Sequence, residues 1–397
     1  MKYTKILGSV ALATLLVAGF TGCGSDDSND NTPVVQAIQP YQRVLSIPGT
    51  SADINDIATK IAEYVINTNE KDVLGFPSDW VIAGANIGKG ETNDGLKDMI
   101  PIPAWNKDLN ATYKTRVIEF CNGAYATQAT NTGQLHGSAL PCEVAVHSDG
   151  TNVYVDMLDA TAIFSIFFPE VKDPTGNLEK MAADVKSELR KMILTSLDGE
   201  VITESTKLMG PKFTAEDIKA ISDKDIYIVT SYKKNNDSSF TKAEAKQLAE
   251  EIIAKLGTDA ATADKNVNGL SAGSAWRAAR PEPIPVPGVF ITEACSPTYA
   301  KMATKLGSEY ISALPCEITT YLDKNDDTNK TISVSILSPK FMFENMFKGA
   351  VEASVARGDM NETEAATYAP LAQTVLDDLN KILNAAVKDS PLGITAK

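Results

Sequence analysis

The stretch EFCNGAYATQATNTGQLHGSALPCE at residues 119–143 returns as EACSPTYAKMATKLGSEYISALPCE at residues 293–317. The two stretches align without a gap at a spacing of 174 residues, and 13 of their 25 positions are identical. Each contains two cysteines, the second within the six letters SALPCE. Similarity at a fixed spacing is the signature of an internal repeat. We therefore expect two tandem copies of one domain, at 40–215 and 216–397.

The similarity continues on both sides of this stretch, although more loosely. Each copy begins with a short β-branched run and an amphipathic helix, at 43–66 and 226–256. PIP, at 101–103 and again at 283–285, leads into the strands TRVIEF and VFITEA. A β-hairpin around a polar turn follows, at 143–158 and 317–337, and then a helical segment, at 178–197 and 363–388. The predicted fold class is α/β, an α+β sandwich: two compact β-α-β-α-β-β domains, each with an added C-terminal helix.

These motifs resemble a known family. A strand that ends in Cys-Asn or Cys-Ser-Pro, an alanine-bearing helix and a Leu-Pro-Cys hairpin start are similar to domain of unknown function 302, in which tandem copies occur. The resemblance covers roughly 60 residues of each copy. Gly123 stands where the family has proline, and both copies have long insertions. The resemblance implies a compact α/β fold and no settled activity.

The N-terminus has the features of a lipoprotein leader. Lys2 and Lys5 precede an apolar run from Ile6 to Phe20, which is shorter than the ~20 residues of a membrane-spanning helix. FTGC resembles the bacterial lipobox, which implies lipidation at Cys23. We therefore expect a signal peptide at 1–22, a disordered tether at 23–39 and attachment to the cell envelope. Gly24 resembles the pattern that sends such proteins to the outer membrane, facing the periplasm.

Charge and composition narrow the range of partners. The formal net charge is −14, and removal of 1–22, which holds two lysines and no acid, makes it −16. A phosphate backbone would be repelled, so we expect no nucleic-acid partner. The expected partners are the membrane, through the anchor, and an unknown small ligand or periplasmic protein. The two copies are expected to pack as a pseudo-dimer.

Four cysteines remain beside Cys23, and three interpretations of them stay open. An even number in an oxidising compartment favours disulfides, and the pairs would be Cys121–Cys142 and Cys295–Cys316. Free thiols for redox or sulfur chemistry are the second interpretation, although neighbouring glutamates would raise a thiol pKa. Thiolate ligation of haem or a metal is the third, although no close Cys-x-x-Cys pair is present. We expect any ligand pocket to lie beside the SALPCE motifs.

Other motifs favour a binding module over an enzyme. The two histidines, His136 and His147, align with Tyr310 and Tyr321, which indicates packed rings and not catalytic or metal-binding groups. GLSAG at 269–273 lacks the strand before it and the later histidine that a hydrolase serine requires. No catalytic residue, cofactor or metal is therefore assigned. The expected function is a non-enzymatic binding or accessory module, with a thiol-dependent redox or sulfur-handling protein and a haem or metal carrier as alternatives.

Four Asn-x-Ser/Thr sequences occur, and three have aspartate two residues earlier. This extended form resembles the acceptor of bacterial periplasmic oligosaccharyltransferases. The glycosylation candidates are Asn110, Asn329 and Asn361. The other explanation is that polar turns rich in aspartate, asparagine, serine and threonine contain such sequences by composition alone.

Overall fold

The computed structural model describes residues 37–50, 53–67, 80–85, 115–140, 142–258, 262–278, 280–313 and 316–397. The predicted leader, Cys23 and Asn110 lie outside these residues. Within the described ranges, no helix has both the length and the apolar character needed to cross a membrane.

The strands of the first half form one antiparallel sheet. Its order is β2-β3-β4-β5-β1-β6, and β7 also pairs with β1. The central pairs β3–β4 and β4–β5 are antiparallel neighbours along the chain, as the predicted hairpin requires. The strands are β1 (Tyr41–Pro48), β2 (Trp80–Ala85), β3 (Thr115–Asn122), β4 (Cys142–Ser148), β5 (Asn152–Leu158), β6 (Thr203–Glu204) and β7 (Leu208–Met209).

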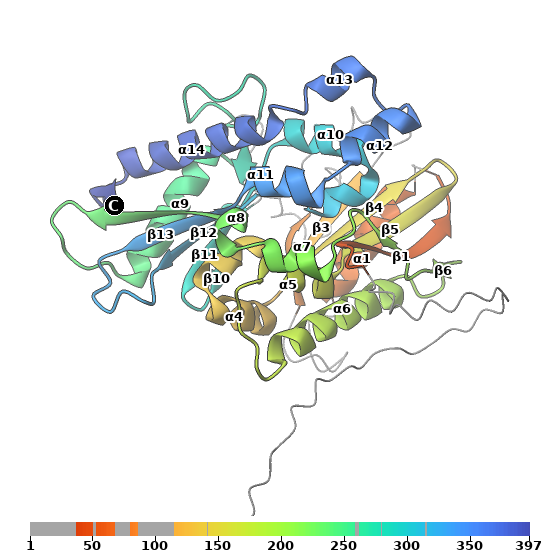
Figure 1. Ribbon diagram of the computed structural model, residues 1–397, viewed down its shortest axis with the longest axis horizontal. Helices are drawn as coiled ribbons and strands as arrows, with labels where there is room; N and C mark the ends of the chain where they lie inside the picture. The colour runs from red at the N-terminus through yellow and green to blue at the C-terminus, as the bar shows by residue number, and fades with distance from the viewer. Residues whose placement is uncertain are drawn as a thin grey trace, which may run out of the picture. The chain divides into compact units, whose positions relative to one another are not determined.

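The strands of the second half form another antiparallel sheet, with the order β10-β11-β12-β13-β8-β14. The short strand β9 pairs with β11. The strands are β8 (Tyr227–Lys234), β9 (Arg277–Ala278), β10 (Ile284–Val286), β11 (Val289–Cys295), β12 (Cys316–Leu322), β13 (Ile332–Leu337) and β14 (Ile394–Ala396). The order matches that of the first sheet strand by strand, with β3 and β4 corresponding to β11 and β12. The predicted α/β class is therefore confirmed (Figure 1).

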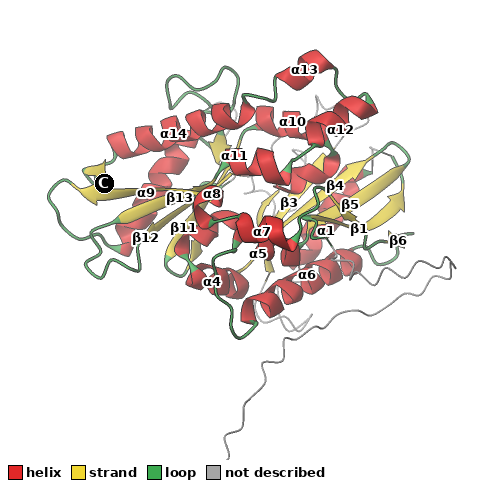
Figure 2. Ribbon diagram, in the orientation of Figure 1, coloured by secondary structure: helices red, strands yellow, loops and turns green. Residues whose placement is uncertain are grey.

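Helices cover one face of each sheet. Helix α1 (Ile54–Asn67) packs on β2, β3 and β4 and contacts α6 (Asn177–Ser196). In the same way α9 (Lys242–Leu256) packs on β11 and β12, and α14 (Leu371–Asp389) lies along α9 (Figure 2). These helices are amphipathic: the buried positions of α14 recur every three or four residues, as one apolar stripe requires.

The other face of each sheet contacts a segment from the opposite half of the chain. The 3₁₀ segment η2 (Gln134–Ala139) lies against β8, β11, β12 and β13 of the second sheet. Its counterpart η3 (Ser308–Ala313) lies against β1, β3, β4 and β5 of the first sheet. Because both faces are covered, all eight residues of β3 are buried. The segment before each SALPCE cysteine is thus exchanged between the two sheets.

The residue after each first cysteine begins a helix. Asn122 accepts hydrogen bonds from the backbone N–H groups of Ala124 and Tyr125 and caps α4 (Gly123–Thr132). Ser296 accepts from Tyr299 N–H and caps α10 (Pro297–Leu306), with proline in its first turn. Asparagine and serine are favoured at this position because their side-chain oxygens satisfy donors that the helix leaves free. The Cys-Asn and Cys-Ser-Pro motifs are therefore strand-to-helix junctions.

Two details differ from the prediction. The segment expected as one helix at 363–388 is divided into α13 (Glu362–Ala366) and α14, with Pro370 between them, because proline cannot donate a helical hydrogen bond. Strand β2 lies between the expected helix of the first copy and the strand TRVIEF, where we predicted no strand. The remaining helices are α5 (Ala160–Phe167), α7 (Ala215–Ala220), α8 (Asp223–Ile226), α11 (Pro339–Phe341), the π-helical turn η4 (Met342–Met346) and α12 (Ala350–Arg357).

Candidate functional site

An aromatic cluster holds η3 against the first sheet. The ring of Tyr310 lies edge-on to Tyr41, with centroids 5.3 Å apart, and edge-on to Phe347 at 5.4 Å. The Tyr41 hydroxyl donates to the backbone oxygen of Met346 at 3.3 Å. Tyr41 lies in β1 and the other three residues come from the second half of the chain, so these contacts join the two halves.

The same arrangement recurs with His136 in the place of Tyr310. The His136 ring lies 4.3 Å from Phe168 and 5.5 Å from Tyr227, whose hydroxyl donates to Phe167 O at 2.6 Å. Burial lowers the pKa of His136 to about 4, although Asp223 lies 3.9 Å away. His136 is therefore a neutral, packed ring at neutral pH, as its alignment with tyrosine indicated.

His147, the second histidine, belongs to a buried ionic network. Its Nε2 lies 2.7 Å from Asp156 Oδ2, and Arg43 donates to the same carboxylate at 2.8 and 3.1 Å. The Arg43 guanidinium stacks 3.8 Å above the ring of Tyr154. Burial would raise the pKa of Asp156, but His147 and Arg43 together lower it. This network ties β1, β4 and β5 together.

The glutamates of the two repeats meet where the sheets face each other. Glu119 is paired with Glu143 across β3 and β4, and Glu293 with Glu317 across β11 and β12. All four are buried, at 3 to 8% exposure. Glu119 and Glu293 occupy equivalent positions in the repeat, and each affects the pKa of the other. Neither carboxyl oxygen of Glu293 has a hydrogen-bond partner among the described residues.

Burial disfavours the charged form of three of these glutamates. It raises the pKa of Glu119, Glu293 and Glu317, and Glu119 raises the pKa of Glu293 and Glu317 further. The charge of Arg280 acts in the opposite direction on Glu119 and Glu293. Within the described residues no group of histidine, cysteine, aspartate or glutamate has an arrangement suited to a metal ion.

The two cysteines of the first copy lie at the same end of the first sheet. Cys142 is paired with Phe120 across β3 and β4, and Cys121 is the next residue of β3. The structure holds Cys121 and Cys142 as thiols and not as the disulfide that we expected. The register explains this, because alternation along a strand directs Phe120 and Cys142 to one face and Cys121 to the other. A disulfide in protein from an oxidising compartment stays a prediction.

Both thiols are in surroundings that disfavour the thiolate. Burial, with a contribution from Glu293, raises the pKa of Cys121 to about 12. Burial, followed by Cys121 and Glu143, also raises the pKa of Cys142. A protonated thiol is a poor nucleophile and a poor metal ligand. In the second copy Cys295 ends β11, and the side chain of Cys316 lies outside the described part of the chain.

A carboxylate clasp attaches the C-terminal helix of the second half. Asp378 of α14 is fully buried and accepts hydrogen bonds from Trp276 Nε1 at 3.2 Å and from the Tyr299 hydroxyl at 2.9 Å. It also accepts from the backbone N and Oγ of Ser271 at 2.9 and 3.1 Å. Ser271 of the GLSAG motif is therefore a structural hydrogen-bond donor.

The first half has a matching clasp. Glu188 of α6 accepts from Trp80 Nε1 at 2.8 Å and from the Tyr125 hydroxyl at 2.6 Å. The Trp–Tyr ring distance is 6.1 Å here and 5.8 Å in the second half. Tyr125 and Tyr299 are 174 residues apart, so the repeat alignment pairs them. Trp80 and Trp276 do not share this spacing, and the alignment therefore could not identify them as equivalent residues.

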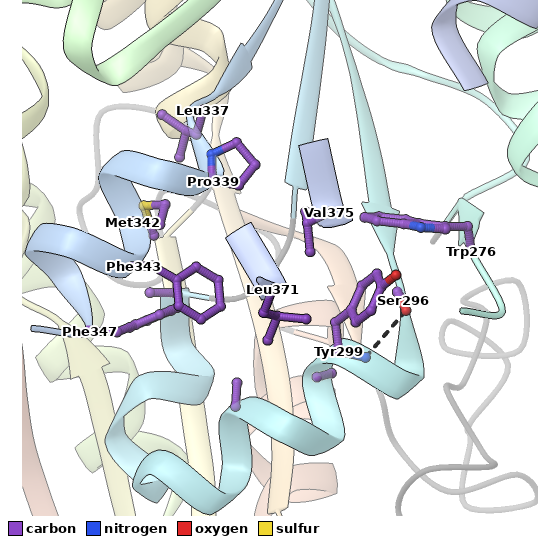
Figure 3. A pocket seen from close by; sticks show the side chains of 13 residues that line it. Trp276, Ser296, Tyr299, Leu337, Pro339, Met342, Phe343, Phe347, Leu371 and Val375 are labelled. Atoms are coloured by element: carbon purple, nitrogen blue, oxygen red, sulfur yellow. Dashed lines mark hydrogen bonds between the residues drawn. The ribbon is translucent and has the colours of Figure 1, made fainter. Parts of the chain in front are cut away.

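An apolar cavity of about 70 Å³ lies beside the second clasp (Figure 3). Trp276 and Tyr299 lie at one end of it and Leu337 and Met342 at the other. Its polar groups are already occupied, since Trp276 and Tyr299 donate to Asp378 and Ser296 Oγ donates to the backbone oxygen of Ser274. The cavity therefore presents a mainly apolar surface. It includes Ala313 of the second SALPCE motif, as expected for a pocket beside these motifs.

A smaller cavity of about 30 Å³ lies between the two SALPCE motifs. Ala139, Leu140 and Glu143 line it from the first motif, and Ala313 and Glu317 from the second. The two copies of the motif thus form one common wall.

The glycosylation candidates within the described residues are exposed. Asn329 lies at the tip of the β12–β13 hairpin with a positive φ of 51°. Asn361 caps α13 by accepting from Glu364 N–H at 2.9 Å, which leaves its amide nitrogen outside that bond. These placements are compatible with modification, which stays a prediction.

Comparisons with known proteins find similarity to a family of unknown function. A family model described as "Domain of unknown function DUF302" matches residues 104–195. Among solved structures the chain is similar to the "Crystal structure of uncharacterized conserved protein DUF302 from Bacillus stearothermophilus", at 17% identity. That match covers 38% of this chain and 94% of the other, with a TM-score of 0.26. No curated protein matches the sequence.

Proposed function

We propose that this chain is a lipid-anchored envelope protein whose folded body binds a small apolar ligand and is not an enzyme. The observation that carries the proposal is the apolar cavity of about 70 Å³ beneath α14. Its size is roughly half that of an engineered ~150 Å³ apolar cavity that binds benzene or xenon. Xenon or a short aliphatic group is therefore a suitable occupant.

The surroundings of the cavity support binding over catalysis. The hydroxyl and indole groups at its wall are held in hydrogen bonds to Asp378, and Ser296 donates to a backbone oxygen. These hydrogen bonds fix the side chains of the cavity wall, and the polar groups that make them are not available to bind a substrate. Cys121, whose burial raises its pKa to about 12, also lacks the character of a nucleophile.

The reciprocal contacts of η2 and η3 support a second part of this proposal. On this proposal the two halves of the chain pack as the subunits of a pseudo-dimer. The described residues that line the cavity belong to the second half, and Ala313, the last residue of η3, connects the cavity wall to the segment that packs on the first sheet.

Xenon and pentane binding test the proposed cavity. We expect both to shift the methyl resonance of Met342, which lines the cavity, in a saturable manner. Ala300→Leu adds a larger side chain to the lining and should abolish the shift. Ala254→Leu makes the same change on the exposed face of α9 and should leave it intact. If neither probe binds to the unmodified protein, the proposal fails.

The anchor is tested separately. The lipobox-like FTGC implies lipidation of Cys23. The described end of the expected tether is joined to the folded body, because Ile38 exchanges backbone hydrogen bonds with Phe213, and a change at Cys23 alters neither of these residues. Cys23→Ser should therefore move the protein from the membrane fraction to the soluble fraction with the same thermal unfolding temperature. Retention of the variant in the membrane fraction would contradict the proposed anchor.

A further inference from the structure

The two cavities share part of their walls. Ala313, Leu337 and Met342 line both the apolar cavity of about 70 Å³ and the smaller one of about 30 Å³ between the SALPCE motifs. In Figure 3, Leu337 and Met342 lie at the end of the apolar cavity away from Trp276 and Tyr299. The smaller cavity therefore continues from that end, with three side chains between the two spaces.

We infer that the ligand is amphipathic, with an apolar tail in the larger cavity and a small hydrogen-bond-donating head that reaches Glu317 and Glu143 in the smaller one. This inference rests on the proposed binding function and specifies the ligand of the same site. A primary ammonium or hydroxyl group is the chemistry that fits.

The need for a donor comes from Glu317. Its side chain lines the smaller cavity and is 4% exposed, and its Oε1 has no hydrogen-bond partner among the described residues. A buried acceptor without a donor destabilises the folded state by about 1–3 kcal/mol. A donor brought by a ligand would remove that cost. Glu143 lines the same cavity and is 3% exposed, so two buried glutamates contribute to one small space.

The size of the smaller cavity limits the head. A space of about 30 Å³ holds one or two groups the size of a water molecule. An ammonium or hydroxyl group meets this limit, whereas a guanidinium or a sugar does not. The other lining side chains are apolar, including Leu140, Ile163 and Phe167, so the two glutamates are the polar part of the described wall.

Met342 is the part of the wall best suited to move. It begins the π-helical turn η4, and such turns interrupt the regular hydrogen bonding of a helix. Methionine is unbranched and has three rotatable bonds, so it adapts to neighbouring groups more readily than leucine. Displacement of this side chain would join the two cavities without a change in either sheet.

Three probes with tails of similar size test the inference: hexylamine, hexanol and methyl pentyl ether. The amine and the alcohol donate a hydrogen bond, whereas the ether only accepts. We expect the two donors to bind the unmodified protein about tenfold more tightly than the ether, because a hydrogen bond to a charged or buried carboxyl group is worth about that factor. Titration calorimetry measures the three affinities.

Variants assign the preference to Glu317. Glu317→Gln places an amide at the cavity wall and should remove the tenfold preference for the donors. Glu352→Gln makes the same change on the exposed face of α12 and should preserve it. The Ala300→Leu variant should block all three probes, which shows that they share the proposed cavity.

The outcomes separate the two proposals. If the ether binds as tightly as the donors and Ala300→Leu blocks it, the inference about the head is overturned while the apolar binding function stands. If no probe binds, both are overturned. The comparison on the unmodified protein decides the inference even if Glu317→Gln fails to fold.

Discussion

Gly137 and Ile311 occupy equivalent positions in η2 and η3, yet they meet different surfaces. A Cβ atom at Gly137 would lie 2.7 Å from Thr319 Cγ2 and 2.9 Å from Thr319 Oγ1. Ile311 instead packs on Ala145 and Val117 of the first sheet. Ala145 is the repeat counterpart of Thr319, so a small residue in one copy faces a larger one in the other. Gly137 therefore fits against Thr319, and Ile311 fits against Ala145, so η2 and η3 could not exchange places without a clash.

The first prediction concerns Gly137 and Thr319. Gly137→Ala should lower the free energy of unfolding by about 1–3 kcal/mol, because the added methyl group overpacks the contact with Thr319. Thr319→Ala in the same chain should recover most of this loss, so that the two changes are not additive. Urea unfolding of the two single variants and the double variant measures the coupling.

A control for this cycle lies in the same copy. Gly123 begins α4, and a Cβ atom there would meet nothing within 4 Å. Gly123→Ala should therefore leave stability unchanged or raise it slightly, since alanine is the better helix former. Strictly additive effects of Gly137→Ala and Thr319→Ala would contradict the proposed contact.

Helices α6 and α14 are attached to their sheets by equivalent clasps that differ in burial. Asp378 is fully buried and accepts four hydrogen bonds, whereas Glu188 is half-buried and accepts two from side chains. Loss of an acceptor is costly when the donors stay buried and modest when water can replace it. The two clasps should therefore contribute unequally to stability.

The second prediction compares the two clasps. Asp378→Ala should lower the free energy of unfolding by about 3 kcal/mol and Glu188→Ala by about 1 kcal/mol. Asp377→Ala, at the exposed neighbouring position of α14, should have an effect close to zero. Urea unfolding followed by circular dichroism measures all three. Equal losses at Asp378 and Glu188 would show that burial does not set the strength of the clasps.

The four buried glutamates influence the molecule as a whole, because they lie where the two sheets meet. Burial raises the pKa of Glu119, Glu293 and Glu317 in the folded state above the ordinary value of 4.5. A carboxyl group with a raised folded-state pKa contributes stability that is fully present below 4.5. That contribution is lost as the pH rises through the folded-state pKa.

The third prediction is therefore a loss of stability toward alkaline pH. The free energy of unfolding should fall as the pH rises above 4.5, by up to about 1.4 kcal/mol per pH unit for each proton released. Burial lowers the pKa of His136 from 6.5 to about 4, so above pH 6.5 this histidine is neutral in both the folded and the unfolded state and does not contribute to the slope.

Two variants test the origin of this slope. Glu293→Gln removes one ionisable group from the cluster and should flatten the slope. Glu352→Gln, at an exposed position of α12, should leave it as it is. Urea unfolding at several pH values above 6.5, where His136 does not contribute, gives the slopes. A slope that survives Glu293→Gln would place its source outside the carboxyl cluster.

The sequence by itself determined the local elements and their order. The alignment of 119–143 with 293–317 predicted the paired strands, the helices after Cys121 and Cys295, and the hairpins that follow. These features depend on neighbours along the chain: Asn122 and Ser296 cap the helices directly after them, and Pro370 interrupts the helix in which it occurs. Repeated local chemistry therefore predicts repeated local structure.

Only the tertiary structure decided which surfaces meet. The exchange of η2 and η3, the proximity of Glu119 and Glu293, and the cavity wall that Glu143 and Glu317 share all involve residues of different halves of the chain. No local pattern encodes such contacts, because they depend on how two sheets dock. The tryptophans of the clasps illustrate the same limit, since the two copies bring them to equivalent places through loops of different length. The two SALPCE motifs line one cavity only because the two halves of the folded chain pack against each other.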